Sequence, residues 1–126
     1  MPLNAAFGWI WILASFLAGL LLGLRFREDD WLGGYGSFRR RLLRLGHVSL
    51  AGLGILNVLF ALGAERLHLG PAALALASRA FIAGGLTMPL CCGLAAFRPR
   101  LQPLFAVPVV SLVLGASLVV AGMLRP

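Results

Sequence analysis

Four long apolar stretches restrict the fold of this sequence more than any other feature. They cover residues 5–24, 46–63, 72–97 and 104–124, and only the third contains a charged residue, Arg79. A helix of about twenty apolar residues spans the roughly 30 Å hydrocarbon core of a bilayer. Backbone polar groups that face lipid must bond within their own segment, so each stretch should be helical. We therefore expect an all-α integral membrane protein, an antiparallel four-helix transmembrane bundle.

The composition supports lipid as the solvent. Of the 126 residues, 60% are hydrophobic and 12% are charged, whereas soluble domains are about half apolar and a quarter charged. A soluble domain of this size has too much surface for its volume to bury so many apolar side chains. We expect one transmembrane domain over residues 1–126.

The charged residues predict an orientation. The formal net charge is +7, and all eleven basic residues are arginines. Eight of them lie in residues 25–45 and 98–103, which flank the stretches on one side, and the other side has three at most. The positive-inside rule then places these two segments in the cytoplasm and both termini outside, in a bacterial cytoplasmic membrane. Anionic lipid headgroups are nearer partners for these arginines than nucleic acid, which we do not expect to bind.

The first connecting segment predicts a membrane-surface element. Ser37 is a suitable N-cap for a short amphipathic helix that begins at Phe38 and leads into the second stretch. Aromatic and basic residues of such a segment suit the headgroup layer. The residues expected at this interface are Trp31, Tyr35, Arg39, Arg40, Arg41 and Arg44.

Small residues recur at helical spacing within the stretches. Small side chains mark the contacts between transmembrane helices, because they allow the backbones to approach closely. The predicted packing positions are Ser15, Gly19, Gly23, Gly54, Ala77, Gly84 and Gly115. Such faces favour a compact bundle that contacts other membrane protein subunits or further copies of itself.

Two prolines lie inside the apolar stretches. Pro89 and Pro108 each lack a backbone N–H and clash with the preceding helical turn. We expect bends near Gly85 and near Leu104.

Few polar residues are available for chemistry within the stretches. His47, Met88 and Cys91 are predicted at a similar depth, and together these residue types suit copper or a haem iron. The alternative for His47 is an interfacial side chain bonded to a backbone carbonyl, with Met88 and Cys91 as apolar filler. Asn57 is expected near mid-membrane, on the flank of the small-residue face of residues 46–63, which includes Gly54.

The sequence carries no catalytic signature, and the apolar stretches contain no Asp or Glu. The leading hypothesis is a non-enzymatic accessory or assembly subunit that packs against larger membrane partners. One alternative is a haem- or copper-binding protein for electron transfer or metal handling, which would use His47 with Met88 or Cys91. A second alternative is a small channel or transporter.

Overall fold

The four apolar stretches form four long helices in the computed structural model, which describes residues 1–126. The helices are α1 (Pro2–Arg25), α2 (Phe38–Gly63), α3 (Pro71–Phe97) and α4 (Ala106–Leu124). Each is long and apolar enough to cross a membrane. For α4, this span includes the short helix that precedes it. The chain contains no strand, so the all-helical prediction is confirmed.

Short 3₁₀ helices lie in the three connections: η1 (Trp31–Gly33), η2 (Ala64–Arg66) and η3 (Pro99–Phe105). The predicted cap of α2 is present, because the Ser37 hydroxyl accepts a hydrogen bond of 3.2 Å from the backbone N–H of Arg40. The arginine-rich segment therefore continues directly into the second apolar stretch as one helix of 26 residues.

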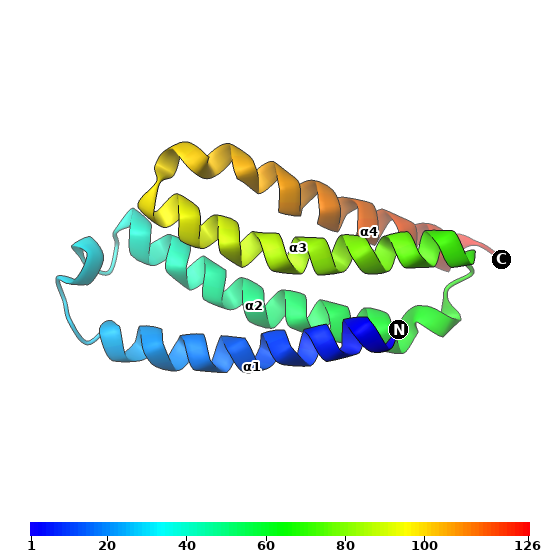
Figure 1. Ribbon diagram of the computed structural model, residues 1–126, viewed down its shortest axis with the longest axis horizontal. Coiled ribbons are helices and arrows are strands. Elements are labelled where there is room, and N and C mark those ends of the chain that lie inside the picture. The colour runs from blue at the N-terminus through cyan, green and yellow to red at the C-terminus, as the bar shows by residue number, and fades with distance from the viewer.

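The helices lie side by side in chain order, with α1 at one edge and α4 at the other (Figure 1). α2 and α4 make no extended contact with each other, because both pack on α3. The bundle is thus more open than the sequence predicts. α3 is its central helix and contains ten buried residues.

The molecule has two distinct ends. Both termini and η2 lie at one end, which we call the terminal end (Figure 1). There the backbone N–H of His68 donates to the Gly122 carbonyl at 3.2 Å. The segment with η1 lies at the opposite end with η3, and we call this the arginine-rich end (Figure 1).

Glycines set the closest contacts between helices. A Cβ at Gly8 would lie 2.5 Å from the Gly54 carbonyl oxygen, and one at Gly54 would lie 2.8 Å from the Gly8 carbonyl oxygen. α1 and α2 therefore meet backbone to backbone, as expected where small residues face each other.

The other predicted packing positions are placed as follows. Ala77, Gly84 and Gly115 are buried; Leu112 of α4 lies against Gly84, and the Phe81 ring lies against Gly115. On α1, Ser15 is buried and Gly19 touches the His47 ring. A Cβ added at Gly23 would have no neighbouring group within 4 Å. The contact stripe of α1 therefore continues from Ser15 toward Gly8 and Asn4, and it ends before Gly23.

Candidate functional site

The three residues proposed as metal or haem ligands face different neighbours. The His47 ring is directed at α1, where its Nδ1 lies 3.4 Å from the Ser15 hydroxyl oxygen. Cys91 points toward η3, and its thiol donates to the Leu104 carbonyl at 3.5 Å. Met88 lines a hollow beside Leu45 and Phe105. No group of three or more His, Cys, Asp or Glu side chains is placed to hold a metal ion, so the arrangement gives a shared centre no support.

His47 lies in a mostly apolar setting. It lines a hollow of about 260 Å³ together with residues of α1, α2 and α3, among them Leu22 and Pro89. The Ser15 hydroxyl donates to the backbone carbonyl of His47 at 3.3 Å, in addition to its contact with the ring. These contacts join α1 to α2, so His47 has a packing role in this structure.

A buried polar cluster joins α1, α2 and α3 toward the terminal end. The Asn4 amide nitrogen donates to the Asn57 side-chain oxygen at 2.8 Å and to the Ser78 carbonyl at 3.3 Å. The Ser78 hydroxyl donates back to the Asn4 side-chain oxygen. Both asparagine side chains are fully enclosed.

Asn57 completes the cluster by bonding to two helices. Its amide nitrogen donates to the Leu53 carbonyl of its own helix at 2.9 Å and to the Phe81 carbonyl of α3 at 3.3 Å. No buried side-chain nitrogen or oxygen in the chain lacks a partner. A fully satisfied network in an apolar interior fixes helix positions rather than leaving a polar group for a ligand.

Asn57 was predicted from the sequence, whereas Asn4 and Ser78 were not. Asn4 precedes the first apolar stretch as the sequence defines it, and the structure extends α1 back to Pro2. The available signal was the spacing of Asn4, Gly8, Ser15 and Gly19, in steps of four, seven and four, which places small or polar residues on one helical face.

Pro89 leaves a carbonyl of α3 without its helical donor, and another helix supplies one. The missing N–H of Pro89 is the normal partner of the Gly85 carbonyl, and Trp11 Nε1 donates to that carbonyl at 2.8 Å. Pro108 lies in the first turn of α4, and the Leu104 carbonyl before this helix accepts from the Ala106 N–H and from the Cys91 thiol. α3 remains one continuous helix through Pro89.

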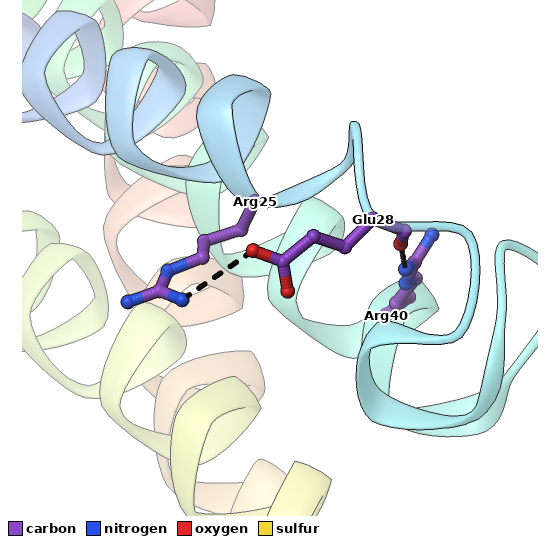
Figure 2. A network of polar contacts seen from close by, with 3 residues as sticks. All are labelled: Arg25, Glu28 and Arg40. Carbon is purple, nitrogen blue, oxygen red and sulfur yellow. Dashed lines mark hydrogen bonds and ion pairs between the residues drawn. The ribbon is translucent and has the colours of Figure 1, made fainter.

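Arg40 is the most enclosed charged group of the molecule. Its side chain is 1% exposed, and its guanidinium donates to the backbone carbonyls of Trp31, Glu28 and Asp29. The guanidinium also lies 5.2 Å from the Phe26 ring centre. Figure 2 shows the bond to Glu28 beside the ion pair that the Glu28 carboxylate makes with Arg25 at 3.7 Å.

Arg40 therefore differs from the headgroup role expected for it, because it organises the first connection from within. Trp31 is half-buried in this connection, where its ring lies 5.5 Å from the Arg40 guanidinium. Tyr35 is 70% exposed. Arg44 lies 4.2 Å from the Tyr35 ring centre and donates to the Tyr35 carbonyl at 3.2 Å.

The two remaining predicted interface arginines keep accessible side chains. Arg39 is exposed and its guanidinium lies 5.8 Å from the ring centre of Phe97 on α3. Arg41 is exposed as well. These positions suit contact with a negatively charged surface.

Comparison with known proteins gives no match to a family model, a curated protein or a solved structure.

Proposed function

We propose that this chain is an integral membrane protein that crosses the bilayer four times, with antiparallel helices and both termini outside. We further propose that it acts as a non-enzymatic accessory or assembly subunit and packs against a helix of a larger membrane partner. The apolar outer surface supports a lipid environment. On α1 alone, Trp9 is 63% exposed, Phe16 is 72% exposed and Leu20 is 61% exposed.

An open groove between α2 and α4 is the observation that carries the proposed subunit role. These two helices both pack on α3 and make no extended contact with each other, and the groove consists of two hollows beside α3. Near the arginine-rich end it forms a hollow of about 400 Å³ that includes Ser49, Gly52 and Met88. Near the terminal end it forms a hollow of about 170 Å³ that includes Gly63 and Phe81.

The glycines of this groove support a protein helix as its occupant. At Gly8, Gly54, Gly84 and Gly115 a neighbouring helix occupies the space beside the glycine, as the fold requires. Gly52 and Gly63 line the groove. A Cβ added at either glycine would have no neighbouring group within 4 Å. Small residues at an open helix face allow another helix backbone to approach closely.

The internal polar groups support a non-enzymatic role. The Asn4–Asn57–Ser78 cluster uses its donors and acceptors to hold helices together. His47, Met88 and Cys91 face separate neighbours. The polar groups hold the helices together, whereas Met88 lines the groove, which is open to another molecule.

Photo-crosslinking in the native membrane tests the proposal. A photoreactive phenylalanine analogue is placed at Leu59 in the groove, and at Phe16 on the outer face of α1 as the matched control. We expect one adduct with a discrete, larger protein from position 59 and none from position 16. Gly52→Leu should remove the adduct without lowering the thermal stability of the isolated chain. Adducts with lipid alone, or with a second copy of this chain, would contradict the proposed partner.

A further inference from the structure

The arginine-rich end contains more positive charge than its own residues neutralise. Eight arginines lie there against Glu28, Asp29 and Asp30. The only ion pair in the chain joins Arg25 to Glu28. Arg40 is surrounded by backbone carbonyls within the first connection. The exposed arginines near η3 have no acidic partner.

Two hollows at this end meet at Pro99. The first, of about 390 Å³, lies between the start of α2 and the end of α3, and its lining includes Ser37, Phe38, Arg39 and Ala96. The second, of about 450 Å³, is formed by Arg98, Pro99, Arg100 and Leu101. Pro99 lines both, so the two hollows adjoin at this residue, and we call the pair the Pro99 cleft.

We propose that the Pro99 cleft binds the phosphate of an anionic phospholipid headgroup. Arg39, in the first turn of α2, lines the first hollow, and Arg98 and Arg100, between α3 and α4, line the second. A guanidinium presents a planar set of donors that matches phosphate oxygens in pairs. Arg39 lies over the Phe97 ring, which restrains its position while its side chain stays exposed.

The apolar part of the cleft favours a lipid over a free anion. Leu32, Phe38 and Ala96 line the same hollow as Arg39. Phe97, at the end of α3, is 54% exposed, and Leu94 one turn earlier is 40% exposed. The charged groups thus stand at the end of an exposed apolar helix face. A phospholipid has the matching order of parts, with its phosphate at the arginines and its acyl chains along α3.

Binding to lipid of defined composition tests this proposal. The purified chain in neutral detergent is titrated with phosphatidylglycerol, with phosphatidylcholine and with inorganic phosphate, and bound lipid is counted by native mass spectrometry. We expect saturable binding of phosphatidylglycerol and weaker binding of phosphatidylcholine. An arginine near a charged lipid surface contributes about fivefold in affinity, so Arg39→Gln and Arg98→Gln should each weaken binding by about that factor.

The variants separate a built site from general attraction. Arg41→Gln removes the same charge at the same end but outside the cleft lining, so it should change the affinity less than twofold. Arg39→Lys keeps the charge but loses the paired donors of the guanidinium, so it should also weaken binding. An equal loss in Arg41→Gln and Arg98→Gln would overturn the proposal in favour of diffuse attraction. Competition by inorganic phosphate at concentrations equal to the lipid would overturn the lipid as ligand.

Discussion

Trp11 on α1 donates a hydrogen bond of 2.8 Å from its indole Nε1 to the backbone carbonyl of Gly85 on α3. Pro89, one turn later in α3, has no N–H to offer that carbonyl. The indole therefore takes the place of a missing backbone donor inside an apolar interior. The Phe7 ring stacks on Trp11 at 4.5 Å and lies against Gly85, which fixes the indole beside its acceptor.

Trp11→Phe should destabilise the chain by about 1 kcal/mol, because it leaves the Gly85 carbonyl without a partner. Pro89→Ala restores the backbone N–H that bonds this carbonyl within α3. In the Pro89→Ala background, Trp11→Phe should therefore cost much less. Unfolding in mixed detergent of the four proteins of this double-mutant cycle measures the coupling free energy.

Trp9→Phe serves as the control for this cycle, because Trp9 is 63% exposed and lies on the outer face of α1. It should leave the stability nearly unchanged in both backgrounds. A coupling free energy of zero between positions 11 and 89 would show that the indole does not compensate for the proline.

Asn57→Leu should be strongly destabilising, by about 2 kcal/mol, although it makes the chain more apolar. It removes the acceptor of the Asn4 amide, which then keeps only its longer bond to the Ser78 carbonyl. One N–H of this enclosed amide is left unpaired, and an unpaired buried polar group carries its full desolvation cost. Ser111→Ala is the matched control, because the Ser111 hydroxyl bonds only the Val107 carbonyl of its own helix. Thermal unfolding in detergent compares the two, and equal stability would contradict a structural role for the cluster.

The long helices could be predicted because the apolar stretches are strong and uninterrupted. Their order in space could not, because small residues on a helix indicate a contact without naming the partner. α3 illustrates this: Gly84 faces Leu112 of α4, while the adjacent Gly85 faces Phe7 of α1. Ala77 and Gly84 were predicted as packing positions of α3, and the structure adds Gly85, which faces a different helix.

The candidate site was harder to predict than the fold. His47 and Cys91 were grouped by depth, but depth along a helix does not determine the direction of a side chain, and these two face different helices. Arg40 was grouped with its charged neighbours at the membrane surface. Its enclosure depends on the path of the connection around it, which charge patterning does not specify.

Gly54→Ala and Gly52→Ala should change the stability in opposite directions. A Cβ at position 54 would lie 2.8 Å from the Gly8 carbonyl oxygen, and such overpacking costs about 1–3 kcal/mol. Position 52 has open space, so alanine there should stabilise α2 by up to about 1 kcal/mol through its helix propensity. Thermal unfolding of the two single variants is the measurement. Equal destabilisation of both would contradict the placement of the groove at Gly52.

Fusion reporters should place both termini outside the membrane and residues 25–45 in the cytoplasm. Eight of the eleven arginines lie on the expected inner side, and basic loop residues determine orientation. The four-span topology would be contradicted if a reporter that works only in the cytoplasm were active when fused after Leu124. Moving arginines from the first connection to the segment around η2 should weaken or reverse the orientation.

Arg40→Ala should disorder the first connection, whereas Arg25→Ala should leave it intact. Figure 2 shows both side chains near Glu28, but their surroundings differ. The Arg25–Glu28 pair is about two-thirds exposed, 63% and 60% for the two side chains, and exposed ion pairs contribute little. Arg40 is enclosed and donates to three backbone carbonyls, and hydrogen bonds from a charged donor contribute about 2 kcal/mol. Hydrogen exchange of residues 26–37 should therefore accelerate at least tenfold in Arg40→Ala and remain near the wild-type rate in Arg25→Ala. Equal exchange in the two variants would show that the connection does not depend on the enclosed guanidinium.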